Sequence, residues 1–486
     1  MRASLVLLAV LPLAAGVAVA CSSSAPAPSA PGAPTPEPGT DAGVTDYPVI
    51  TLEAEPQRPG DPAKGYRALV NEAYVPCGIP DSAYSRVYGP AAEGDRIKGR
   101  EGRNATLPYN FTAMTTKEGV RLVTSNCLTC HAGRIEGKLL VGLGAADGDF
   151  TNSPAGTASL VGNLVNDPQE RAEYEKWNER VQTAAPYSVL STRGPNPADA
   201  FTAVLFAHHD PKTMAWSKTP LFEVAPPVDL PVDVPPWWRM KKKTSMFYSG
   251  AGRGDHARIE MTASVLCTSS VEESRAIDAY FADVRAYIAS IEAPKYPHAI
   301  DTALAEQGRT VFEATCSRCH GTYGGDDTYP NRLVTLPEIG TDPLLGSGAG
   351  QFGEPFVKWY GDSFFGELAR FEPKEGYIAP PLDGIWATAP YLPNGSVPTV
   401  AALLDSTQRP TYWTRDFDDS SAYDQAALGW VFTALDHGKA EATGSKKQKA
   451  EIYDTTLPGY SNAGHTFGDA LTAEDRAAVI EYLKTL

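Results

Sequence analysis

The chain has 486 residues, of which 42% are hydrophobic and 21% are charged, and its formal net charge is −16. This length predicts about two or three domains, each large enough to bury a full core without many disulfides. The acidic balance argues against a nucleic-acid-binding surface, because neutralising phosphates needs clustered lysine and arginine. Nucleic acid is therefore not an expected partner.

Residues 1–20 have the form of an export signal. Arg2 supplies a positive charge, an apolar run too short to span a bilayer comfortably follows, and small residues precede Cys21. Cys21 and the serines after it resemble a bacterial lipoprotein signal, in which the cysteine is lipidated; simple secretion is the alternative. More than one acyl chain is needed for stable anchoring. We therefore expect an exported protein that is held to a bacterial membrane only by lipid on Cys21 and faces the periplasm or the cell exterior.

Residues 21–45 are rich in proline and contain almost no large apolar side chains. Such a segment cannot bury enough surface to offset its ordering entropy, so we expect a disordered tether. No later run reaches the length of a membrane span, so the rest of the chain is expected to be soluble.

Four of the seven cysteines form two copies of the pattern Cys-x-x-Cys-His, namely Cys127, Cys130 and His131, and Cys316, Cys319 and His320. This pattern is typical of c-type haem attachment, in which two thiols bind the vinyl groups of one porphyrin and the histidine binds the iron. We therefore predict two covalently attached haems, with His131 and His320 as proximal iron ligands. The alternatives are a redox-active cysteine pair, which does not need the histidine, and half of a zinc site.

Cys77 and Cys267 remain once Cys21 and the motif cysteines are set aside. Two leftover cysteines in an oxidising compartment predict a structural disulfide. Two buried free thiols are the alternative.

The segments around the two motifs look duplicated. Gly119 and Gly308 each stand eight positions before the first cysteine of a motif, and both motifs are expected to end helices. Asp301 is a suitable N-cap for the second of these helices. Capping boxes that begin at Ser270 and Thr472 predict a closing helix in each half.

This arrangement resembles the cytochrome c fold, in which the first and last helices cross and a small residue permits close approach. We expect a mainly α protein with two cytochrome c-like haem domains, at 105–295 and 301–486, and long irregular loops. An N-terminal extension at 46–104 is expected to pack on the first domain.

The distal ligand of the second haem decides whether that iron transfers electrons or binds oxygen. None of the six methionines follows His320, which leaves His437 and His465 as candidates. We select His465 because it lies on a glycine-flanked loop just before the closing helix. A loop histidine bonded to a neighbouring carbonyl is the alternative. Two histidine ligands would give a low-potential, low-spin centre.

The first haem has more candidates for its distal side, namely His208, His209, His256 and Met261. We select His256, which follows a glycine-rich loop and precedes an amphipathic stretch. An open distal side lined by aromatic residues is the alternative.

Trp237 and Trp238 follow a proline-rich loop and precede Arg239 and a run of three lysines. Such a segment can pack indole rings on a porphyrin and neutralise its propionates. A half-buried strand followed by an exposed lysine run is the alternative.

Three segments, 316–320, 377–399 and 462–468, resemble the bacterial di-haem cytochrome c peroxidase superfamily and are most similar to its rubber-oxygenase-like di-haem cytochromes. The resemblance implies one haem that handles substrate, one that relays electrons, and an aromatic bridge, for which Trp386 is a candidate. A core tryptophan is the alternative. Pro393 stands where members often have histidine, and the missing downstream methionine fits the oxygenase-like branch.

We therefore predict an exported di-haem c-type cytochrome that acts as a peroxidase-like or oxygenase-like oxidoreductase at the first haem. Its partner would be a redox protein or a small-molecule oxidant or substrate. One alternative is a pure electron-transfer protein with two six-coordinate irons, and another is a haem-based sensor or scaffold without turnover.

Overall fold

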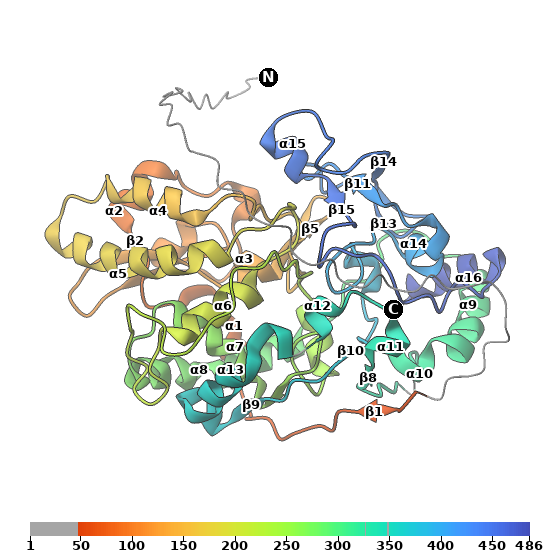
Figure 1. Cartoon of the computed structure of the whole chain (residues 1–486), viewed down its shortest axis with the longest axis horizontal. Coiled ribbons are helices and arrows are strands. Elements are labelled where there is room, and N and C mark those ends of the chain that lie inside the picture. The colour runs from red at the N-terminus through yellow and green to blue at the C-terminus, as the bar shows by residue number, and fades with distance from the viewer. Residues whose placement is uncertain (1–46, 326, 348) are drawn as a thin grey trace, which may run out of the picture. The chain divides into compact units, whose positions relative to one another are not determined.

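A computed structural model describes residues 47–486 of the protein, except positions 326 and 348 (Figure 1). The predicted export signal, Cys21 and the tether lie outside the described residues. Tyr47–Leu486 form one compact unit by themselves. None of the helices in this part of the chain combines the length and the apolarity that a bilayer span requires.

The helices that precede the linker near residue 295 are α1 (Pro62–Asn71), α2 (Asp81–Val87), α3 (Leu128–His131), α4 (Pro154–Gly162), α5 (Pro168–Ala184), α6 (Ala198–Ala207), α7 (His256–Glu260) and α8 (Val271–Ser290). Those that follow it are α9 (Thr302–Thr315), α10 (Ser317–His320), α11 (Leu336–Ile339), α12 (Pro343–Gly346), α13 (Ala349–Asp362), α14 (Val400–Leu404), α15 (Lys446–Ala450) and α16 (Ala473–Leu483).

The strands form small antiparallel sheets. Three sheets have three strands each, in the orders β1 (Ile50–Thr51), β8 (Arg332–Val334), β10 (Tyr377–Ile378); β14 (Thr433–Leu435), β11 (Tyr412–Thr414), β15 (Tyr453–Asp454); and β2 (Ile79–Pro80), β4 (Arg121–Ser125), β3 (Phe111–Thr115). Three sheets have two strands each: β12 (Tyr423–Asp424) with β13 (Gly429–Trp430), β5 (Ala132–Ile135) with β6 (Lys138–Val141), and β7 (Gly252–Gly254) with β9 (Ala369–Phe371).

The predicted fold class, mainly α with two cytochrome c-like haem domains, is wrong. About 39% of the structure is helical and 13% is strand, and the strands are spread over several sheets. The segment before the first motif shows why. It is rich in β-branched residues and forms the hairpin of β3 and β4, with Ala113 opposite Val123, where we expected a helix. Gly119 lies in the turn of this hairpin with φ +86°. The predicted domain boundaries stay a prediction.

The crossing of α9 and α16 is the close helix contact that the sequence predicts around Gly308 (Figure 1). A Cβ atom on Gly308 would lie 1.9 Å from the carbonyl oxygen of Ala478, so only glycine permits this approach. The Asp301 carboxylate accepts hydrogen bonds from the first turn of α9, and Thr472 caps α16 in the same way. The predicted role of Gly308 is confirmed.

A second close crossing joins α1 to α8, and the sequence analysis did not find it. A Cβ atom on Gly65 of α1 would lie 1.9 Å from the carbonyl oxygen of Asp283. Gly65 therefore plays in the crossing of α1 and α8 the role that Gly308 plays in the crossing of α9 and α16. The helix comes from the segment that we treated as an extension.

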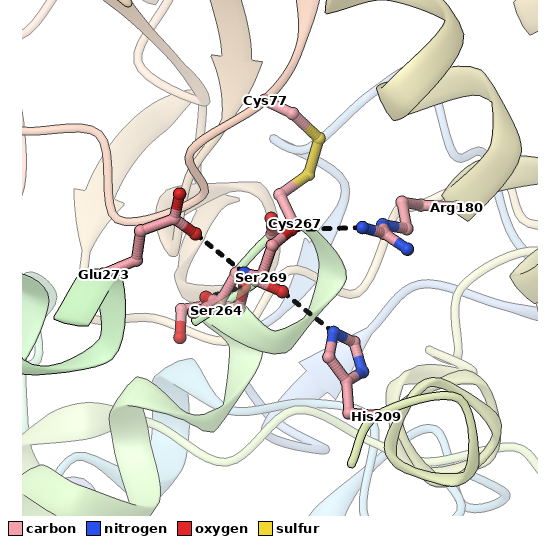
Figure 2. The surroundings of a disulfide bond; sticks show 8 residues. Cys77, Arg180, His209, Ser264, Cys267, Ser269 and Glu273 are labelled. Atoms are coloured by element: carbon pink, nitrogen blue, oxygen red, sulfur yellow. Dashed lines mark hydrogen bonds between the residues drawn. A yellow bond between two sulfur atoms is a disulfide. The ribbon is translucent and has the colours of Figure 1, made fainter. Parts of the chain in front are cut away.

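A disulfide joins Cys77 to Cys267, with their Cα atoms 5.5 Å apart (Figure 2). It fixes the segment that leads into α8, whose N-cap Ser270 accepts a hydrogen bond from the Glu273 amide. In the predicted capping box the Glu273 carboxylate would accept from the amide of Ser270. It accepts instead from the amide of Ser269, at 2.7 Å. The disulfide thus ties α8, and through it α1, to the sheet that contains β2.

Replacing Gly308 by alanine should lower the free energy of unfolding by about 1–3 kcal/mol, because the new methyl group meets rigid backbone of α16. Gly361 in α13 is the matched control, since a Cβ atom there meets open space. Thermal unfolding followed by circular dichroism should show a lower Tm for Gly308→Ala and an equal or higher Tm for Gly361→Ala. Equal stability of Gly308→Ala and the unmodified protein would contradict the close crossing.

Candidate functional site

The second motif is carried on the end of α9 and on α10. His320 is half-buried, and its Nδ1–H donates a hydrogen bond to the carbonyl oxygen of Pro380 at 2.8 Å. This bond fixes the tautomer in which Nε2 carries the free lone pair, as in metal-binding histidines. Burial lowers the pKa of His320, which favours the neutral ring that a metal requires.

A cavity opens beside His320, and His465 also lines it. It encloses about 1280 Å³ of space between atoms, including part of the solvent at its mouth. Its walls are mostly apolar and come from helices α9, α14 and α16 and from residues 377–393: Phe312, Ile378, Leu382, Tyr391, Val400, Leu404, Val479 and Leu483. A flat apolar ligand with a polar edge fits such a site.

The ring centroids of His320 and His465 lie 6.2 Å apart. Two imidazoles that bind one metal from opposite sides, each with its nitrogen about 2 Å from the ion, have centroids about 6 Å apart. The two rings therefore lie at the spacing of an axial ligand pair. His437 is exposed and bonds to Asp436, so of the two predicted candidates only His465 lines the cavity.

The first motif lies on α3, directly after β4. Cys130 Sγ accepts a hydrogen bond from the Asn196 amide at 3.0 Å, and burial raises the pKa of Cys127 to about 12 and that of Cys130 to about 11. The His131 ring stacks on Trp237, with centroids 4.8 Å apart and planes inclined by 21°. Burial lowers the pKa of His131 to about 4, so this ring is also neutral.

Two side chains of α7 bring unpaired polar atoms into the interior near this motif. Neither ring nitrogen of His256 and neither carboxylate oxygen of Glu260 has a hydrogen-bond partner, and all four atoms are buried. Burial raises the pKa of Glu260 to about 8 and, helped by the positive charges of Arg285 and Lys243, lowers that of His256 to about 4. Glu260 lies close enough to Cys127 for its charge to raise the pKa of that thiol.

The sequence analysis missed Glu260. Its only signal was its place four residues after His256, which puts both side chains on one face of a helix.

The other predicted distal candidates of the first haem have structural roles. Both ring nitrogens of His209 bond to carbonyl oxygens, those of Leu205 and Thr268, and Figure 2 shows this ring beside the disulfide. His208 bonds to the Ser217 carbonyl. Met261 is fully buried in an apolar cluster.

The 3₁₀ helix η4 (Trp237–Lys241) reaches both sites. Trp237 stacks on His131, whereas Trp238 belongs to the hydrophobic cluster that contains Phe312 and donates its indole N–H to the Asp383 carbonyl at 2.8 Å. Arg239, the next residue, lines the cavity itself. Trp386 instead donates to the Pro294 carbonyl and meets tyrosines edge-on, which is a core position.

The basic residues after Trp238 divide into two kinds. Lys241 pairs with Glu292, and Lys242 pairs with Asp383. Arg239 is buried and donates to the Asp383 carbonyl and the Thr388 hydroxyl, and burial lowers the pKa of half-buried Lys243 to about 8. Arg239 and Lys243 are therefore suited to bind the propionates of a haem.

The residues around the second motif fit the predicted cofactor. Buried polar atoms without partners are rare in folded proteins, yet His131 Nδ1, His256, Glu260 and His465 Nδ1 are such atoms. They gather beside the two motifs, and the second motif also faces an apolar cavity. A haem at the second motif would fill this cavity.

Residues 376–414 match the model of a family described as RoxA-like, cytochrome c-like. The match indicates a haem-binding, cytochrome c-like region in this part of the chain. A region of this kind implies covalently bound c-type haem. In the structure the matched residues form one wall of the cavity and include Pro380, the acceptor for His320. The wider peroxidase superfamily stays a prediction.

Two curated relatives resemble parts of the chain. The uncharacterized protein y4iJ of Sinorhizobium fredii is 31% identical over 260 residues, which make up 40% of this chain and 41% of that protein. The uncharacterized protein y4iM of the same organism is 31% identical over 193 residues, 35% of this chain and 42% of that protein. The chain thus spans about two fifths of the length of the curated relatives it matches.

Glu260→Gln should become progressively more stable than the unmodified protein as pH rises. The folded state keeps the Glu260 proton up to about pH 8, whereas an unfolded chain loses it near its usual pKa of 4.5, so raising the pH between these values destabilises the fold. The pH-dependent gain in the free energy of unfolding of Glu260→Gln over the unmodified protein should vanish below about pH 4 and reach roughly a few kcal/mol above pH 8. Melting curves at several pH values measure it.

The exposed Glu354 provides the control, because Glu354→Gln should shift the Tm by an amount that does not grow with pH. A pH-independent difference for Glu260→Gln as well would contradict the burial of this carboxyl group.

Proposed function

We propose that this cytochrome carries two c-type haems and is an exported oxidoreductase of the peroxidase or oxygenase type. The first haem, at Cys127, Cys130 and His131, would handle substrate, and the second, at Cys316, Cys319 and His320, would relay electrons. The difference between the two sites carries the proposal. The second pairs two histidines at axial spacing, whereas the ring contact of His131 is with Trp237.

A c-type haem supplies one-electron redox chemistry and, where an axial position is free, a site for dioxygen or peroxide. His320 and His465 would occupy both axial positions of the second iron and restrict it to electron transfer. The apolar walls around them keep water away and favour the lower overall charge of the reduced state.

At the first site the groups on α7 are suited to proton transfer. Glu260 keeps its proton at neutral pH, and neutral His256 has a lone pair that accepts one. Arg285 and Lys243 place positive charge beside them, which would favour an anionic group bound there. We propose that His256, our predicted distal residue, serves as a proton acceptor and leaves the iron open.

Trp237 and Trp238 would connect the sites. Trp237, Trp238 and Arg239 are consecutive residues of one segment. Trp237 stacks on His131, Trp238 belongs to the hydrophobic cluster that contains Phe312, and Arg239 lines the second cavity. This segment supports a relay role better than the predicted Trp386, whose indole bonds to the linker.

Export and lipid anchoring through Cys21 remain our proposal for localisation. The disulfide between Cys77 and Cys267 supports it, because such bonds persist in oxidising compartments. The proposed partner is a redox protein or a small-molecule oxidant or substrate that reaches the first site.

The fully reduced protein should bind one equivalent of carbon monoxide, because only the first iron is open. His465→Ala should bind two equivalents, and His437→Ala, which removes an exposed histidine, should still bind one. Optical titration measures the stoichiometry. No binding by the unmodified protein would favour a pure electron-transfer cytochrome, and two equivalents would contradict the ligand role of His465.

Turnover separates an enzyme from a sensor once one open haem is found. Oxidation of an electron donor by peroxide, or oxygen-dependent cleavage of an unsaturated hydrocarbon, supports the enzyme. Binding without either reaction favours a haem-based sensor or scaffold.

A further inference from the structure

The loop that presents His465 has a backbone that the local sequence does not favour. His465 has φ +48°, in the left-handed region that non-glycine residues rarely adopt, and Gly464 before it has φ +76°. Such a residue costs about 1–2 kcal/mol and persists only where surrounding contacts hold it. Contacts outside the loop must therefore determine where the imidazole lies.

One guanidinium group supplies most of these contacts. Arg409, just after α14, directs its N–H groups at main-chain carbonyl oxygens on two separate segments. Nε donates to Ala402 (3.1 Å), Nη1 to Asn462 (2.7 Å) and Gly464 (2.6 Å), and Nη2 to Leu403 (3.1 Å) and His465 (3.0 Å). An arginine has five N–H donors in a fixed plane, so these five bonds use its full capacity.

The opposite side of the loop is closed by backbone. The His465 amide donates to the Ile339 carbonyl at 2.7 Å, and a Cβ atom on Gly464 would lie 2.2 Å from the Gly340 carbonyl carbon. The loop is thus held between the end of α11 and Arg409. The Arg409 side depends on a side chain that can be replaced without changing the loop sequence.

The two acidic residues whose charges act on Arg409 form their own bonds with other groups. Asp405 forms an ion pair with Arg476 at 3.3 Å, and Asp469 accepts from the Ser406 amide and hydroxyl. The five hydrogen bonds of the Arg409 guanidinium all go to carbonyl groups, so the geometry of this group, more than charge neutralisation, defines its role here.

We propose that Arg409 is a positioning residue that holds the His465 imidazole at axial spacing from His320 and thereby keeps the second site closed to exogenous ligands. This deepens the proposed function and rests on it, because it takes His465 as an iron ligand. The planar fork is essential to the role: a lysine retains the charge but cannot bond to two segments in one plane.

The test uses the full-length, haem-loaded protein with Arg409→Gln and Arg409→Lys. Two readouts are the amplitude of the low-spin ferric signal in electron paramagnetic resonance and the carbon monoxide stoichiometry of the reduced protein. Both variants should lose at least half of the low-spin signal of the second haem and bind close to two equivalents of carbon monoxide in place of one. Added imidazole should restore the low-spin signal, since only the internal ligand is displaced.

Arg171→Gln is the matched control. Arg171 also donates to main-chain carbonyls, those of Gly162 and Val165, but it lies on α5 away from both motifs. Its replacement should leave both readouts unchanged. Haem content per chain, measured on the same samples, shows that each variant is loaded.

His465→Ala separates failure of this inference from failure of the proposed function. If His465→Ala opens the second haem while both Arg409 variants retain the full low-spin signal and one equivalent of carbon monoxide, the role of Arg409 is wrong and the ligand role of His465 stands. If His465→Ala changes neither readout, the ligand assignment itself fails. If Arg409→Gln does not accumulate, Arg409→Lys decides, and an unchanged low-spin signal in it overturns the proposal.

Discussion

The separation of the His320 and His465 rings is the constraint on which the rest of the second site depends. Their centroids lie 6.2 Å apart across an apolar cavity, although 145 residues separate them in the chain, counted from 320 to 465. The Pro380 carbonyl orients one ring, and backbone contacts hold the other in a left-handed conformation. The close crossing of α9 and α16 at Gly308 supplies the back wall of the same cavity.

The two motifs are coupled through one short segment. η4 places Trp237 against His131 and Arg239 in the wall of the second cavity, so the sites share a structural element. A displacement of this segment would alter both sites together. This arrangement explains physically why an electron-relay centre and a substrate-side centre would occur in one compact unit.

Several features of the two sites were predictable from the sequence because they depend on residues that lie close together in the chain. The haem motifs follow from covalent spacing, His465 from the absence of later methionines, and Gly308 from its place on an amphipathic helix. Glu260, Arg409 and Gly65 were not predictable, because their roles arise from contacts with distant segments. The fold class was wrong because the short strands, such as β3 and β4, are stabilised by pairing that no single segment reveals.

The central claim, two covalently attached haems, is tested most directly by the intact mass of the denatured protein after export from a host that matures c-type cytochromes. Covalent attachment survives denaturation, so the measured mass should exceed that of the processed polypeptide by two haem groups. An excess of one haem would contradict the division of roles between the motifs, and no excess would contradict the whole account.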